Sequence, residues 1–217
     1  MRRVAVILAL FALLLPAAAR ASGIDLTNKF GTVTITELGG VVSHQSELMS
    51  WGLTKAAAGH DLGSVSFSTG AFTAGTSDGL WGNGSFAGGA GTSFDVFGVG
   101  TWANTLTGKK CGSGCSLFAG SFVGPVTWTV FSHGPGQWNY VFTLSGAIQG
   151  TYWDGRTVNG TTTQTIYAYK NQWFQDHQGG ISLGKSNLAV PEPGTLGLLG
   201  TGLIFVAGSL RRKLFGA

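Results

Sequence analysis

The chain carries little charge: only 10% of its 217 residues are Asp, Glu, Lys or Arg. Six of the 13 basic residues and one of the nine acidic residues lie within the first 21 or the last 28 positions. The sequence pI of about 9.3 therefore reflects the two ends, because the body between them is nearly neutral. Without a basic stripe, the body lacks the electrostatic footprint of a nucleic-acid-binding protein.

Sequence patterns of common catalytic and metal sites are also missing. The chain has no Gly-x-Ser-x-Gly nucleophile elbow, no phosphate-binding loop and no zinc-protease helix. Its histidines, at positions 44, 60, 133 and 177, do not have the spacing of metal ligands. We therefore predict no catalytic residue, no metal site and no cofactor.

Acidic residues are sparse, which limits the enzymatic alternatives. A glycoside hydrolase needs two carboxylates across a cleft, and Glu37 and Glu47 lie on neighbouring predicted strands. Because carboxylates are mostly exposed in folded proteins, surface positions are the simpler interpretation of both. A hydrolase that uses Glu37 or Glu47 remains the third hypothesis.

Cysteine is limited to Cys111 and Cys115, within the segment Lys-Lys-Cys-Gly-Ser-Gly-Cys. In an exported protein, two cysteines separated by three flexible residues predict a disulfide that closes a small loop. Such a short loop stabilises the fold modestly, by about 2 kcal/mol. Free or metal-bound thiols are the alternative.

The first 21 residues have the pattern of a secretory signal peptide. Arg2 and Arg3 precede an apolar stretch from Val4 to Leu15, Pro16 ends it, and small residues follow up to Ala21. Twelve apolar residues are too few for a membrane-spanning helix. We predict a signal helix that signal peptidase removes by cleavage between Ala21 and Ser22.

The last 28 residues have three parts in a fixed order: a proline motif at 190–195, an uncharged stretch at 196–210 and a basic end at 211–213. Prolines 191 and 193 favour an exposed, extended linker because they fix φ and lack the N–H group. The uncharged stretch predicts a short transmembrane helix in the cytoplasmic membrane, with the basic end on the cytoplasmic side. The chain thus divides into residues 1–21, a body at 22–189 and a tail at 190–217.

This tail resembles the PEP-CTERM sorting signal of Gram-negative bacteria. The resemblance implies that an exosortase, a membrane cysteine peptidase, recognises and processes the chain near Val190, Pro191, Glu192 and Pro193. It also implies export to the cell envelope, the cell surface or the extracellular matrix, initially with an anchor at 196–210, and an association with exopolysaccharide and biofilm. These implications do not extend to the activity of the body.

The sequence of the body predicts a single all-β domain. It holds 31 of the 37 glycines and all seven tryptophans, a composition typical of many short strands joined by glycine-containing turns. Alternating segments, half apolar and half polar, predict strands at 32–36, 41–49, 64–68, 93–99, 126–130, 138–144 and 161–169. Asp154-Gly155 predicts a hairpin with a two-residue turn. Antiparallel strands at this spacing favour a β-sandwich or jelly roll.

Tryptophan is the remaining clue to function. Trp128 and Trp138 alternate with polar residues, which is typical of core positions. Trp81 and Trp153 lie near glycine-rich turns. If their rings are exposed there, they could stack on a sugar ring. Our leading hypothesis is a structural or adhesive envelope protein without enzymatic activity. The alternative is an exopolysaccharide-binding module that uses Trp81 or Trp153.

Overall fold

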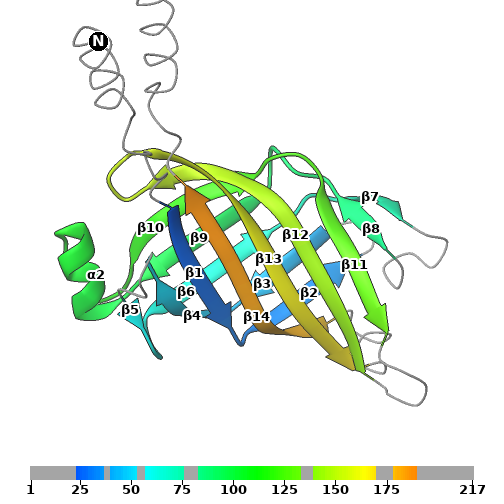
Figure 1. Ribbon diagram of the computed structural model, residues 1–217, viewed down its shortest axis with the longest axis horizontal. Coiled ribbons are helices and arrows are strands. Elements are labelled where there is room, and N and C mark those ends of the chain that lie inside the picture. Colours follow the sequence, from blue (N-terminus) through cyan, green and yellow to red (C-terminus); the bar gives the residue numbers. More distant parts are fainter. Residues whose placement is uncertain are drawn as a thin grey trace, which may run out of the picture. The chain divides into compact units, whose positions relative to one another are not determined.

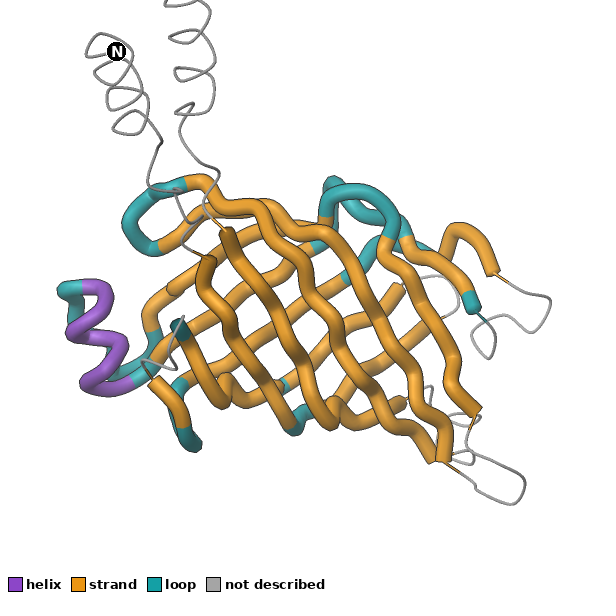
Figure 2. Tube along the Cα trace, viewed as in Figure 1, coloured by secondary structure: helices purple, strands orange, loops and turns teal. Residues whose placement is uncertain are grey.

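The computed structural model describes residues 23–36, 40–52, 57–75, 83–132, 139–169 and 178–189 (Figures 1 and 2). Residues Ser22–Val190 form one compact unit. The first strands are β1 (Gly23–Lys29), β2 (Thr32–Thr36), β3 (Gly40–His44), β4 (Ser46–Trp51), β5 (Ala57–Ala58), β6 (Gly63–Ser68), β7 (Phe72–Gly75) and β8 (Gly84–Phe86). Then follow β9 (Ser93–Gly98), helix α2 (Gly100–Thr107), β10 (Cys115–Phe122), β11 (Val126–Ser132), β12 (Asn139–Tyr152), β13 (Thr157–Tyr169) and β14 (Gln178–Ala189).

Eight strands close into an antiparallel barrel. Around the ring the order is β1, β4, β6, β9, β10, β12, β13 and β14, and each strand pairs with the next. The ring closes where β14 pairs with β1, from Gly23 opposite Ala189 to Asn28 opposite Gly184 (Figure 1). An interior of eight strands is just wide enough for side chains to fill it.

The all-β class predicted from the sequence is confirmed, but the predicted sandwich or jelly roll is wrong. A sandwich consists of two sheets that pack face to face, whereas here one ladder of strand pairs runs around the whole body (Figure 2). The alternation of apolar and polar residues is the same in both architectures. It identifies the inward side chains but not the strand that closes the ring.

The other strands continue strands of the ring. Strand β2 continues β1 after Phe30 and Gly31, and β4 continues β3 after Gln45; all three of these connecting residues have positive φ. Strand β11 continues β10 along β12, and β7 and β8 form a hairpin beyond β6 and β9. Breaks of this kind let long strands bend around a narrow barrel.

One side of the interior is packed with aromatic rings. Trp128 stacks on Phe142 with ring centroids 4.6 Å apart, and Phe86 meets the Trp128 ring edge-on at 6.0 Å. The fully buried rings on strands β6 to β12 are Phe67, Phe86, Phe94, Phe118, Phe122, Trp128 and Phe142. Burial of aromatic rings contributes strongly to the stability of a core, so we expect these residues to be important for stability.

The opposite side of the interior holds a buried polar network. The Asn28 amide donates to Ser46 Oγ (2.7 Å) and to Gln164 Oε1 (2.9 Å), and Gln164 Nε2 donates back to Asn28 Oδ1 (3.3 Å). Gln164 Nε2 also donates to Thr162 Oγ1, which accepts a second bond from Ser186. These five side chains are buried, and their mutual bonds offset the cost of removing them from water.

Each predicted strand coincides with an observed one, although Gln45 divides the predicted strand at 41–49 into β3 and β4. The elements that were not predicted as strands are β1, β5, β7, β8, α2, β10 and β14. Strands β1 and β14 show little alternation, because polar residues such as Asn28 and Ser186 point inward. Helix α2 is too short, at eight residues, to give a sustained period. The signal helix at 1–21 and the transmembrane helix at 196–210 lie outside the described residues.

Candidate functional site

The β12–β13 hairpin fixes the position of Trp153. Gly155 N–H donates to the Tyr152 carbonyl (2.9 Å), and Tyr152 N–H donates to the Arg156 carbonyl (3.0 Å). Gly155 has a φ of +84°, so its lack of a side chain permits the turn. The hairpin therefore lies at the predicted Asp154-Gly155 site, but four residues, not two, separate the strands. Trp153 N–H also donates to the Leu117 carbonyl of β10 (3.1 Å).

The rings of Trp51 and Tyr152 pack against the Trp153 indole. The Trp51 ring lies 6.1 Å away in an edge-on arrangement, and the Tyr152 ring lies 5.3 Å away. Trp153 itself is only half-buried, and it lines a surface groove. Its orientation is thus set before any ligand arrives, which lowers the entropy cost of binding.

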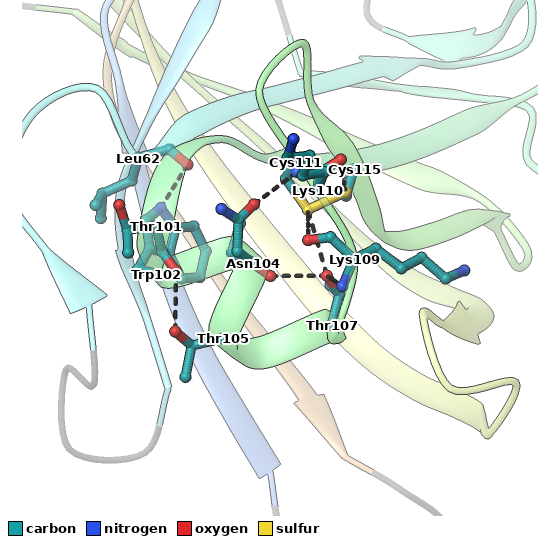
Figure 3. Close-up of a disulfide and its surroundings, with 11 residues drawn as sticks. Leu62, Thr101, Trp102, Asn104, Thr105, Thr107, Lys109, Lys110, Cys111 and Cys115 are labelled. Atoms are coloured by element: carbon teal, nitrogen blue, oxygen red, sulfur yellow. Dashed lines mark hydrogen bonds between the residues drawn. A yellow bond between two sulfur atoms is a disulfide. The ribbon is translucent and has the colours of Figure 1, made fainter.

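Helix α2 and the disulfide form the other wall of this groove. Trp102 Nε1 donates to the Leu62 carbonyl (3.1 Å) and attaches the helix to the barrel (Figure 3). Asn104 Oδ1 accepts a bond from Cys111 N–H (2.6 Å), and Cys111 is bonded to Cys115 with a Cα–Cα distance of 5.0 Å. The segment that carries Lys109 is therefore held at both ends.

The groove has a volume of about 340 Å³. Its lining residues are Thr107, Lys109, Cys115, Ser116, Ala119, Thr151, Tyr152 and Trp153. They offer one indole, three aliphatic hydroxyl groups and one ammonium group. Aromatic rings suit the apolar faces of a ligand, while hydroxyl groups donate and accept hydrogen bonds. A sugar ring, which has apolar faces and a polar edge, matches this combination.

The phenol of Tyr152 faces the barrel and takes no part in the groove chemistry. Its hydroxyl donates to the Leu188 carbonyl (3.2 Å). Burial raises the pKa of Tyr152 well above its ordinary value, although the charge of Arg156 opposes the shift. Tyr152 therefore stays protonated and neutral at physiological pH.

Beside the groove, Asp154 and Arg156 form an ion pair with no net charge. Arg156 Nε donates to Asp154 Oδ2 at 2.6 Å, and the guanidinium carbon lies 5.8 Å from the centre of the Tyr152 ring. Slight burial raises the pKa of Asp154, but hydrogen bonds and charge from Arg156 outweigh it and lower that pKa overall. Asp154 is therefore ionised and matched by Arg156.

Of the residues singled out in the sequence, the structure places Trp153, Cys111 and Cys115 in or beside one groove. Glu47, by contrast, accepts bonds from Asp61 N–H (2.8 Å) and from the His60 ring (3.2 Å) on another part of the surface. Other singled-out positions lie outside the described residues: Ala21, Ser22, Glu37, Trp81, His133, Trp138, His177, Val190, Pro191, Glu192 and Pro193. Within the described ranges, no group of three His, Cys, Asp or Glu side chains could hold a metal ion.

Sequence reasoning did not identify Lys109, Ser116 or Thr151 as site residues. They come from three separate segments, and none belongs to a recognisable motif. The one signal was the position of Lys109 and Lys110 directly before Cys111. A disulfide loop fixes its neighbours, so residues next to a short loop of this kind are reasonable candidates for a surface site.

Comparison with known proteins identifies one end of the chain. Residues 189–213 match the PEP-CTERM protein-sorting motif. The chain ends in a PEP-CTERM sorting signal. The match confirms the resemblance seen in the tail. A signal of this kind implies an exported protein that an exosortase sorts to the cell envelope. The match overlaps the barrel at a single residue, Ala189 at the end of β14. Neither curated proteins nor solved structures gave a match to the chain.

In the ranges that the structure describes, none of the helical residues form a segment long and apolar enough to cross a membrane. The predicted span at 196–210 belongs to the PEP-CTERM tail and lies outside those ranges.

Asp95, whose cross-strand neighbour Ala119 lines the groove, makes the stability of the fold depend on pH. It lies opposite Ala119 on β10, and burial raises its pKa above 3.8, although bonds from Gly120 and Ser93 oppose the shift. Because the folded-state pKa exceeds the unfolded one, protonated Asp95 stabilises the fold at low pH. This contribution is lost as the pH rises through the folded pKa.

We therefore expect the stability of Asp95→Asn relative to the native chain to increase between about pH 3 and about pH 7. Urea unfolding followed by tryptophan fluorescence measures the difference at each pH. Asp61→Asn, an exposed carboxylate of a loop, is the control. A difference for Asp95→Asn that stays constant across this range would contradict the assignment.

Proposed function

We propose that this PEP-CTERM protein is an adhesive envelope component that holds polysaccharide in the groove beside Trp153 and does not cleave it. The groove is the observation that carries the proposal, because it combines a pre-oriented indole with hydroxyl groups from α2, β10 and β12. Export by way of the sorting signal brings such a site to the compartment where extracellular polysaccharide is found.

The described carboxylates support a binding role over hydrolysis. None of them lines the groove, and most have a partner elsewhere: Asp25 with Asn187, Glu47 with His60, Asp95 with Ser93 and Asp154 with Arg156. A glycosidase requires two carboxylates on either side of the scissile bond. The groove offers no such pair, so we propose that the protein is not an enzyme.

Replacement of Trp153 by alanine tests the proposal. We expect at least a tenfold loss of affinity, because a central aromatic contact typically contributes more than about 1.4 kcal/mol. Isothermal titration of the full chain in detergent with oligosaccharides from the host's own extracellular polysaccharide measures it. Tyr167→Ala is the matched control, since Tyr167 is 46% exposed on β13 and does not line the groove.

Binding that survives Trp153→Ala, or that falls equally in Tyr167→Ala, would remove the groove from the proposal. Circular dichroism of each variant separates loss of contact from loss of fold. Trp153→Phe, which keeps an aromatic ring at the hairpin, is expected to retain part of the affinity.

A second candidate, a purely structural matrix protein, is favoured by the outer surface. Two rows of hydroxyl side chains cross strands β11, β12 and β13 there: Thr127, Ser145 and Thr163 in one row, and Thr129, Thr143 and Thr165 in the next. Adjacent strands lie about 4.8 Å apart, so the hydroxyl groups form a regular array without charge. If no oligosaccharide binds in the groove, this array is the surface to test.

A further inference from the structure

We infer that the groove selects acidic sugars, with Lys109 as the residue that recognises the carboxylate of a uronic acid. This inference rests on the proposed function and specifies its ligand. Among the side chains that line the groove, Lys109 carries the one ionised group, because the other titratable lining residue, Tyr152, is neutral and turned towards the barrel.

In the part of the chain that the structure describes, no carboxylate forms an ion pair with Lys109. The carboxylate of Asp154 is held by Arg156 at 2.6 Å. Asp95, the cross-strand neighbour of Ala119, has bonds from Gly120 and Ser93. A lysine without an acidic partner in a polar groove attracts an anion, and its attraction is stronger where water is displaced.

The backbone at Lys109 is held in place. Lys109 N–H donates to Thr107 Oγ1 (3.3 Å), and Gly108 N–H ends helix α2 by donating to the Asn104 carbonyl (2.8 Å). Two residues later, Cys111 is fixed by Asn104 and by the disulfide (Figure 3). The ammonium group thus starts from a fixed point on the groove wall, which reduces the freedom lost on binding.

The arrangement fits the shape of a uronic acid. Such a sugar has a ring face that stacks on an indole and a carboxylate at the ring edge. Trp153 supplies the stacking surface, Lys109 the cation, and Ser116 and Thr151 the hydroxyl groups for the remaining ring substituents. A neutral sugar would use the same ring contacts but leave the ammonium group without a partner.

Methyl esterification tests the inference because it removes the charge and keeps the sugar. The probes are uronate oligosaccharides of gluco, galacto and manno configuration, each paired with its methyl ester. Isothermal titration with the full chain in detergent is expected to show at least one acid bound about tenfold more tightly than its ester, the size of a charged hydrogen bond. The preference should decrease as salt is added.

Lys109→Gln is expected to abolish the preference for the acid while the affinity for the ester stays within about twofold. Lys110→Gln is the matched control, because Lys110 is the exposed neighbour that does not line the groove. An equal loss in Lys110→Gln would overturn the assignment to Lys109 and attribute the preference to general surface charge.

The outcomes separate the inference from the proposed function. Binding of acid and ester with equal affinity, lost in Trp153→Ala, would overturn acidic selectivity and leave glycan binding intact. If neither these probes nor the host's own oligosaccharides bind, the proposed function fails and the inference fails with it.

Discussion

Replacing Trp128 by alanine is expected to lower the free energy of unfolding by about 4 kcal/mol. The Trp128 side chain is fully buried, stacks on Phe142 and meets the edge of Phe86. Its removal would leave a cavity between three strands that cannot collapse, because closure of the barrel fixes their spacing. Urea unfolding, followed by circular dichroism to avoid dependence on tryptophan fluorescence, measures the loss.

Tyr167→Ala provides the control for Trp128→Ala. Tyr167 is also an aromatic residue on a strand of the barrel, but it faces outward. Surface changes of this type usually alter stability by less than about 0.5 kcal/mol. A loss below about 1 kcal/mol for Trp128→Ala would mean that this side of the interior is not packed as described.

Asn28→Leu is expected to lower the free energy of unfolding by about 3 kcal/mol, although leucine is similar in size. The change removes both amide bonds between Asn28 and Gln164, as well as the bond to Ser46. Gln164 would then keep one of its bonds, to Thr162, while its carbonyl oxygen would be buried without a partner. The measurement is again urea unfolding of the full chain.

Asn187→Leu is the matched control, since Asn187 donates a bond of 2.6 Å to Asp25 on the exposed face of the neighbouring strand. It should lose much less stability. The double change Asn28→Leu with Gln164→Met should cost less than the sum of the two single changes, because it removes both partners together. Additive losses would show that the two amides do not act as a pair.

The sequence predicts the inward residues of this barrel better than its architecture. Phe142 and Leu144 alternate with Thr143 and Ser145 on β12, and both apolar side chains are fully buried. Alternation reports burial on one face, which a sandwich and a barrel share. The pairing of β1 with β14 that closes the ring joins residues more than 150 positions apart, and no local pattern encodes such a contact.

The polar network illustrates a second limit. Gly184 lies opposite both Asn28 and Gln164, and a Cβ atom at this position would overlap the two amide side chains. In the sequence, Gly184 resembles many other glycines, and Asn28 and Gln164 resemble surface residues. Their buried roles depend on three strands that meet only in the folded chain.

The candidate site could be predicted only in its most local parts. Cys111 and Cys115 are close in sequence, so their pairing follows from spacing and compartment. Trp153 follows from its place beside a turn. Lys109 and Thr151 join the same groove because β10 and β12 pair, with Phe118 opposite Tyr152. That register is a property of the sheet and not of any one segment.

The strand that closes the barrel is also the last one before the sorting motif. If the chain is exported from its first residue to its last, β1 cannot pair with β14 until nearly the whole body has crossed the membrane. The barrel stays open until then. Contacts between such distant residues form slowly. A cut downstream of Ala189 leaves β14 whole and able to close the barrel, while a cut inside β14 leaves an open sheet with exposed edges that are prone to aggregate.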